Sequence, residues 1–257
     1  MSNPHDDTPR VEEEHGLKSL LATICQFFAV RIHPAGWPFI LISAIGGLLL
    51  TFLWEGFAVI GLIATVYCVY FFRDPVRCVP VREGLIVSPA DGRVIAIEHD
   101  CGWPEELKDA PRDGKRPTRI SIFLSVFDCH VIRAPAAGEI EETVYREGAF
   151  VNAALDKASE DNERLSVLMK AEGDDETRIG FTLIAGFVAR RIVYDIFPKK
   201  PVVAGGRVGI IRFGSRVDVY LPAGVAPMVG IGQRTLGGET ILADLKSKEK
   251  VRAIRMD

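Results

Sequence analysis

The hydrophobic positions divide the chain into a short apolar segment and a longer region of mixed pattern. From Trp37 to Phe72 the only charged side chain is Glu55. The runs on either side of it, 37–54 and 57–72, are each close to the minimum for crossing ~30 Å of hydrocarbon at about 1.5 Å per residue. The pattern predicts two short helices in a hairpin. A re-entrant hairpin and the buried helix pair of a soluble protein are the alternatives.

The region after Pro80 contains short runs of β-branched and aromatic residues bounded by Gly, Pro and Asp, which are typical of strands. One helix is expected near 151–159, and the polar stretch 103–117 is expected to be an exposed loop. The predicted fold class is mainly β (α+β), with an N-terminal hydrophobic helical hairpin followed by an antiparallel β-rich catalytic domain. The predicted strands lie at 92–98, 118–125, 139–145, 164–170, 178–184, 190–196, 206–212 and 216–221.

Charge adds detail at both ends of the apolar segment. Residues 1–16 hold five acidic side chains against Arg10, a contribution of −4 to the net charge of −3. We expect residues 1–33 to form an acidic tail followed by a possible amphipathic helix at 17–30. Basic residues flank the segment, and their bias toward the cytoplasm predicts that both ends of a membrane-anchoring hairpin at 34–72 lie on that side. These residues are Arg31, Arg73, Arg77 and Arg82.

Composition argues against two other classes of partner. No stretch clusters Lys and Arg with interleaved aromatic residues, so no nucleic-acid partner is expected. The five cysteines are scattered without a CxxC pair, so no zinc or redox site is expected, and no other metal site is predicted. A reducing compartment fits this cysteine usage.

Three segments of the β-rich region carry candidate chemistry. Gly214-Ser215 interrupts a long strand pattern, and a turn is the ordinary interpretation. The alternative is that the hydroxyl of Ser215 attacks the preceding carbonyl, since a Gly reaches strained backbone angles. Asp91 lies in a Pro-Ala-Asp-Gly sequence, which is good turn chemistry by itself. His130 lies in the strand-like segment 124–135, where a lone histidine is more often structural than catalytic.

The order of six segments gives these residues a common context. Together the segments resemble the bacterial phosphatidylserine decarboxylase proenzymes, and the Gly-Ser-Arg tripeptide resembles the short form of that family. The segments are FFRDPVR (71–77), SPADGRV (88–94), FDCHVIRAP (127–135), FVNAALDKASEDNER (150–164), IAGFVARRIV (184–193) and FGSRVDVYLP (213–222).

The resemblance implies a pyruvoyl-dependent carboxy-lyase that converts phosphatidylserine to phosphatidylethanolamine. In this family Ser215 would attack the carbonyl of Gly214, and β-elimination of the resulting ester would leave a pyruvoyl group on the chain 215–257. That chain would form a heterodimer with 1–214, and a higher homo-oligomer is left open. The covalent group would form a Schiff base with the serine amine and withdraw electrons as CO2 leaves, without an external cofactor.

The resemblance also implies site residues. Asp91 resembles the acid of the self-processing triad, and His130 is the candidate general base and later proton donor, with its share in each step left open. Arg133 stands where longer members carry a second histidine; its guanidinium stays charged, so we expect it to bind the substrate carboxylate or phosphate. Asn152 is a further candidate at the lipid entrance.

The resemblance implies that the hairpin anchors the enzyme in the lipid bilayer of the bacterial inner membrane, with the domain 73–257 on the cytoplasmic side. Two other functions compete. SPADGRV and 229–243 also resemble hairpins of lipoyl-like or adaptor β modules without catalysis, but the chain lacks their exposed lysine turn. A serine hydrolase using Ser215 would need a GxSxG elbow, which is absent.

Overall fold

The computed structural model of the chain describes the β-rich region and the apolar segment. The expected helices at 17–30 and 151–159, and the candidate Asn152, lie outside the described residues. The described residues are 31–111, 113–148, 162–174, 176–186, 191–212, 214–247 and 249.

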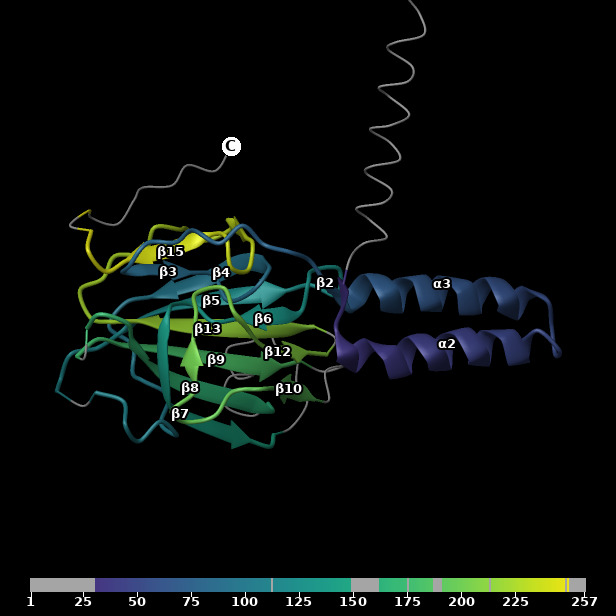
Figure 1. The fold of residues 1–257 in the computed structure, drawn as a ribbon, viewed down its shortest axis with the longest axis horizontal. Helices are drawn as coiled ribbons and strands as arrows, with labels where there is room; N and C mark the ends of the chain where they lie inside the picture. The colour runs from purple at the N-terminus through teal and green to yellow at the C-terminus, as the bar shows by residue number, and fades with distance from the viewer. Residues whose placement is uncertain are drawn as a thin grey trace, which may run out of the picture.

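The apolar segment forms the predicted hairpin of two helices, α2 (Trp37–Leu50) and α3 (Gly56–Phe71). Figure 1 shows the two helices side by side, projecting from one end of the β-rich region. Gly47 and Gly61 bring the backbones together, because a Cβ added to Gly47 would lie 2.6 Å from the Cα of Gly61. No helix in the described part of the chain has both the length and the apolar content needed to cross a membrane.

The remaining elements are almost all strands, as the fold class predicted. A short 3-10 turn, η1 (Pro34–Gly36), precedes α2. The strands are β1 (Arg31–Ile32), β2 (Arg73–Asp74), β3 (Leu85–Val87), β4 (Gly92–Glu98), β5 (Thr118–Leu124), β6 (Val131–Arg133), β7 (Gly138–Arg146), β8 (Arg164–Ala171), β9 (Arg178–Ala185), β10 (Ile192–Tyr194), β11 (Pro201–Val202), β12 (Arg207–Ile211), β13 (Ser215–Leu221), β14 (Arg234–Thr235) and β15 (Ile241–Asp244).

The largest sheet has eight strands in the order β11-β7-β8-β9-β13-β5-β4-β14, and its neighbouring strands are antiparallel. A second sheet has the order β10-β12-β6, and β3 pairs with β15. Each predicted strand overlaps an observed one, although the segment 190–196 holds only the short β10. The shorter strands β1, β2, β3, β11, β14 and β15 were not predicted, because two to four residues give no readable pattern.

Both faces of the central strand β13 are buried. Val217, Val219 and Leu221 point into the main hydrophobic core. The opposite face carries Arg216, Asp218 and Tyr220, which are also buried. A strand covered on both sides therefore places its first residue, Ser215, well inside the protein.

The stretch 103–117 covers part of this sheet, so the prediction of an exposed loop was wrong for three of its residues. Trp103, Leu107 and Ala110 are buried, and they form a separate cluster with Leu168 and Tyr220. Most residues of the stretch 103–117 are polar, so its composition predicted an exposed loop. Its three apolar residues are buried because they pack against the outer face of the sheet.

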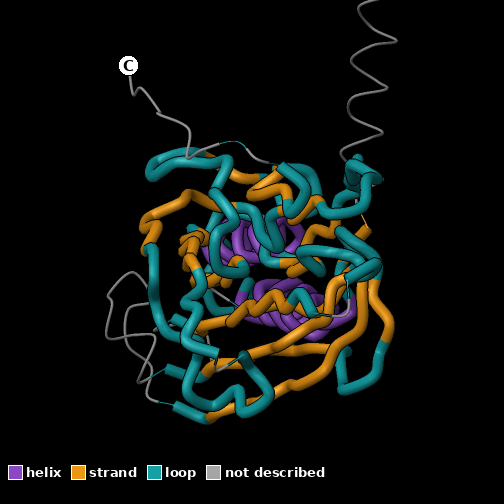
Figure 2. The backbone as a smooth tube through the Cα atoms, turned by 90° about the vertical axis from the view of Figure 1, so that its left-hand side faces the viewer, coloured by secondary structure: helices purple, strands orange, loops and turns teal. Residues whose placement is uncertain are grey.

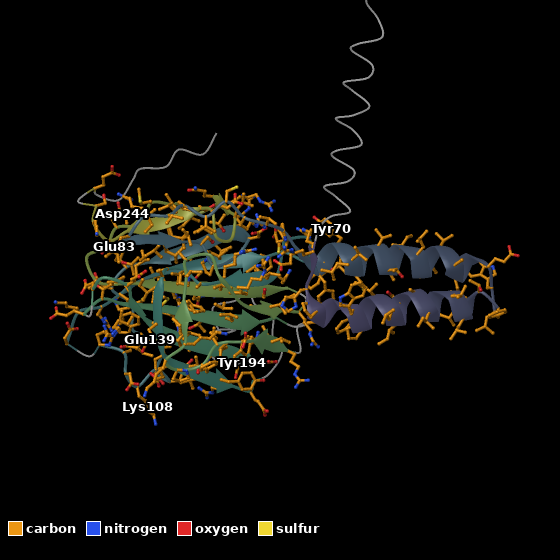
Figure 3. The ribbon with its side chains drawn as sticks, viewed as in Figure 1. Tyr70, Glu83, Lys108, Glu139, Tyr194 and Asp244 are labelled. Atoms are coloured by element: carbon orange, nitrogen blue, oxygen red, sulfur yellow. The ribbon has the colours of Figure 1, made fainter. Side chains whose placement is uncertain are left out.

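The hairpin is docked firmly on the sheet that contains β6 and β12. Phe71 and Phe72 pack with Val131 and Ile210 in a second core cluster. The hydroxyl of Tyr70, labelled at this junction in Figure 3, donates to the carbonyl of Phe127 at 3.0 Å. Figure 2, which looks along the hairpin, shows both helices behind the strands. The helices therefore hold a defined position against one end of the β-rich region.

Candidate functional site

The site begins at the corner where the chain passes from one sheet to another. Strand β12 ends at Ile211 in the three-stranded sheet, and β13 begins at Ser215 in the eight-stranded sheet. Gly214 makes the corner with φ +68°, in the left-handed region that favours glycine. Among the described residues a Cβ there would meet only Val126, at 3.9 Å, so within this part of the chain backbone conformation and not space requires the glycine.

Ser215 directs its side chain into the apolar core. It lies on the same face of β13 as Val217, and its register partners are Leu124 on β5 and Ala185 on β9. The residue is fully buried, and its Oγ has no hydrogen-bond partner among the described residues. A buried hydroxyl without a partner costs about 1–3 kcal/mol, so this atom calls for a functional explanation.

The carbonyl of Gly214, which precedes Ser215, is held by a backbone donor. The N–H of Gly186 donates to the Gly214 oxygen at 3.0 Å. A donor in this place stabilises negative charge on that oxygen if the carbonyl carbon is attacked. The sequence patterns did not single out Gly186, although its position directly after the buried strand β9, inside a segment that carries the family resemblance, was a usable signal.

His130 contacts the same corner from the turn before β6. Its Nδ1 lies 3.0 Å from the carbonyl oxygen of Asp128, which can only accept, so Nδ1 carries the hydrogen. Its Nε2 accepts the N–H of Gly214 at 3.2 Å. Burial lowers the pKa of His130 to about 4, and the Phe71 ring packs against the imidazole at 4.4 Å. The imidazole is therefore a neutral base at pH 7. It accepts a hydrogen bond from Gly214, the residue whose carbonyl forms the Gly214–Ser215 peptide bond.

The turn that positions His130 is held by the carboxylate of Asp128. One oxygen accepts from the N–H and hydroxyl of Ser125 at 2.8 and 2.7 Å, and the other pairs with Arg234 at 2.5 Å. Because the side chain fixes the turn, the backbone carbonyl of Asp128 is held in place to select the tautomer of His130.

Asp91 lies in the turn between β3 and β4, as the sequence predicted. One oxygen is 2.6 Å from the guanidinium of Arg77, and the other accepts the N–H of Gly237 at 2.7 Å. Among the described residues, Asp91 makes no hydrogen bond with His130 or Ser215. Its role in self-processing stays a prediction.

Arg133 lies at the start of a buried polar network. Its two terminal nitrogens donate to the carbonyls of Gly205 at 2.9 Å and Pro75 at 2.8 Å, and it pairs with Asp74 at 3.4 Å. Asp74 also accepts from Nε of Arg207 at 2.5 Å. These contacts tie β6 to the segment after the hairpin. The predicted role of Arg133 in substrate binding stays a prediction.

Comparison with known proteins identifies the family. The sequence model for phosphatidylserine decarboxylase matches residues 65–243, more than half of the chain. Three relatives named phosphatidylserine decarboxylase proenzyme are similar over most of their length. The protein of Cereibacter sphaeroides is 51% identical over 88% of this chain and 95% of its own. That of Paramagnetospirillum magneticum is 50% identical (90% and 93% covered), and that of Beijerinckia indica is 47% identical (92% and 99% covered).

The family match covers the part of the chain that contains the cleavage corner. The matched range includes the corner at Gly214, the buried hydroxyl of Ser215 and the neutral imidazole of His130. The proenzyme names imply a processed form, and a lyase made as a zymogen is the activity that they support. The chain therefore belongs to the phosphatidylserine decarboxylase family.

Proposed function

We propose that this enzyme decarboxylates phosphatidylserine to phosphatidylethanolamine with a pyruvoyl group that it makes from its own Ser215. One observation carries the proposal. The buried, unpartnered Oγ of Ser215 follows a left-handed Gly214, whose carbonyl oxygen accepts the N–H of Gly186. A nucleophile, an acceptor carbonyl and an oxyanion donor therefore occupy one corner of the fold.

Self-cleavage balances in three steps. Attack of Ser215 Oγ on the carbonyl carbon of Gly214 forms a C–O bond and breaks the C–N bond, and the freed nitrogen takes up a proton. The ester then loses the α proton of residue 215 and the Gly214 carboxylate by β-elimination. Water adds at the α carbon, ammonia leaves, and a ketone remains at the start of 215–257. His130, whose Nε2 shifts from the Gly214 N–H to the hydroxyl, is the base that we assign to the first proton.

The surroundings of residue 215 suit a ketone. Leu124 and Ala185 flank it across the sheet, and Val217 follows on the same face, so its neighbours are apolar. The pyruvoyl group would take the substrate amine as a Schiff base and accept the electron pair as CO2 leaves. The imidazole of His130 is placed to return a proton to the substrate carbon.

The two cleavage products are expected to stay together. Strand β13 pairs with β5 through residues 215–221 and with β9 through residues 215–220, and these ladders do not depend on the bond that breaks. The new N-terminus is therefore held in place by its neighbours, and the mature enzyme is a heterodimer of its own fragments.

We further propose that the hairpin anchors the enzyme in the inner membrane, with this site at the cytoplasmic face. Large apolar side chains are exposed all around it, among them Ile42, Phe52, Leu53, Leu62 and Ile63. With 14 and 16 residues, α2 and α3 reach about 21 and 24 Å, less than the ~30 Å of the hydrocarbon core. We therefore propose that the hairpin enters the bilayer from the cytoplasmic side without crossing it, with the β-rich domain at the lipid surface. Phe127, which is exposed beside the hairpin base, would then meet the lipids.

The cleavage mechanism is tested by comparing the wild type with Ser215→Ala. The wild type should run as two pieces on a denaturing gel, and mass spectrometry should find pyruvoyl in place of an amine on the smaller one. Ser215→Ala should stay whole and release no CO2, while the surface variant Ser247→Ala should behave as the wild type. A single uncut chain from active wild-type enzyme would contradict the mechanism.

The membrane assignment has a separate test. Leu49→Asp, a change on the exposed face of α2, should reduce co-sedimentation with lipid vesicles because burying a charge in hydrocarbon costs about 2.5–3.5 kcal/mol. Wild-type protein that stays in solution with vesicles present would refute the assignment.

A further inference from the structure

Two arginines oppose each other next to the cleavage corner. The β10–β12 register pairs Ile192 with Ile211, so Arg191 and Arg212 lie opposite each other just beyond the ladder. The backbone N–H of Arg212 donates to the carbonyl of Arg191 at 3.4 Å. Like charges directly opposite each other across a sheet are destabilising, so an anion bound between them would stabilise this pair.

The described part of the chain does not supply that anion. Within it, neither arginine has a carboxylate at ion-pair distance. Glu163 attracts Arg212 from farther away, but its Oε1 already accepts from the hydroxyl of Tyr145 and the N–H of Ile192. Burial and the neighbouring Arg191 both lower the pKa of Arg212.

The Nε of Arg212 is buried without a hydrogen-bond partner. Arg77 and Arg119 also have an unpartnered Nε, but their terminal nitrogens pair with Asp91 and Glu98. Arg212 has no such pair with any carboxylate of the described residues. Its guanidinium is therefore available to a ligand from outside the described chain.

The position of Arg212 lies between the lipid anchor and the reacting residue. Its guanidinium carbon is 5.2 Å from the centre of the Phe39 ring on α2. Along the chain it is three residues from Ser215, a reach of at most about 10 Å. A lipid lying along the apolar hairpin would bring its headgroup first to Arg212 and then to residue 215.

We propose that Arg212 and Arg191 bind the phosphodiester of the lipid substrate. This inference rests on the proposed function and names the subsite that holds the headgroup. A guanidinium fork matches two phosphate oxygens, and the phosphodiester is present in substrate, transition state and product alike. The substrate carboxylate fits less well, because a tight ion pair would stabilise the group that must leave as CO2.

The test measures kcat and KM of Arg212→Gln and Arg191→Gln with a monomeric short-chain phosphatidylserine and with an acyl ester of serine that lacks the phosphate. Loss of charge-assisted hydrogen bonds should raise KM for the phospholipid about 10- to 100-fold and leave kcat nearly unchanged. KM for the phosphate-free ester should not change. Arg212→Lys should recover part of the loss. Arg82→Gln is the control, because Arg82 pairs with Asp244 at the end of the domain opposite the hairpin (Figure 3).

The contrary outcomes are distinct. An equal rise in KM for both substrates, or an unchanged KM for the phospholipid, would overturn the subsite. Short-chain phosphatidylglycerol should compete with the substrate while inorganic phosphate does not; equal competition by inorganic phosphate would mean a free-phosphate site and reject the lipid assignment.

Failure of the proposed function would be recognised differently, as a wild type that is active without being cut. Self-cleavage of each variant is followed on the gel. If Arg212→Gln cuts poorly because it lies close to the scissile bond, Arg191→Gln carries the comparison.

Discussion

Two arginines near the base of the hairpin, Arg133 and Arg212, differ in the hydrogen bonds and ion pairs that they make with the described protein. Arg133 donates both terminal nitrogens to the protein, including the carbonyl of Gly205, and it pairs with the buried Asp74. Arg212 has no ion pair in the described chain, and the hydroxyl of Ser215 close by is equally unpartnered. Buried polar groups normally have hydrogen-bond partners. The saturated network, in which Arg133 has its partners, is therefore structural. The unsaturated corner, with Arg212 and Ser215, is where chemistry is expected.

The largest effect should come from removing the base at the unsaturated corner. His130→Gln keeps an acceptor for the N–H of Gly214 but removes the basic nitrogen, so self-cleavage should slow about 10²- to 10⁴-fold. The measurement is the rate at which freshly refolded proenzyme becomes two bands. His99→Gln, at the exposed end of β4, should cut at the wild-type rate. Equal rates for His130→Gln and the wild type would exclude the histidine as the base.

A smaller effect, on stability and not on turnover, should follow from breaking the saturated network. Arg133→Gln leaves the carbonyl of Gly205 and part of Asp74 without donors, and should lower the free energy of unfolding by about 2–3 kcal/mol. Denaturant titration of uncut Ser215→Ala protein, with and without the change, measures it. Lys246→Gln, which removes an exposed ion pair with Glu83, should cost no more than about 1 kcal/mol. A folded Arg133→Gln enzyme with a raised KM would instead show that Arg133 binds the substrate. The contrast between a structural Arg133 and a ligand-binding Arg212 would then be wrong.

The smallest effect on stability is expected from Gly214→Ala, which tests whether the backbone conformation of the corner matters to self-cleavage. Gly214→Ala meets no steric obstacle, so its cost is that of a left-handed alanine, about 1–2 kcal/mol in the free energy of unfolding. Gly224→Ala should cost the same, since Gly224 has φ +81° and open space around it. Only Gly214→Ala should slow self-cleavage, because relaxation of its φ moves the carbonyl away from the N–H of Gly186. Equal cutting rates for the two variants would show that the corner geometry does not matter to the reaction.

Much of the fold and part of the site could be predicted from local patterns. The single charge at Glu55 separated two apolar runs that form α2 and α3, and short runs of β-branched and aromatic residues predicted strands such as β4 and β13. The interruption at Gly214-Ser215 marked the corner between sheets, and the resemblance added a reaction for it. The stretch around Leu107 was misjudged because its few apolar residues are buried by a sheet face that lies far away in the sequence.

The sequence by itself determined the apolar hairpin, the predominance of strands, the family and the serine on which the proposed reaction depends, because each is written in residues that are near neighbours along the chain. Only the tertiary structure decided which distant groups meet there. The N–H of Gly186 reaches the Gly214 carbonyl, His130 reaches its amide, and Arg191 faces Arg212. The physical reason is that contacts between strands depend on sheet order and register, which are set by how the whole core packs and not by the pattern within one strand.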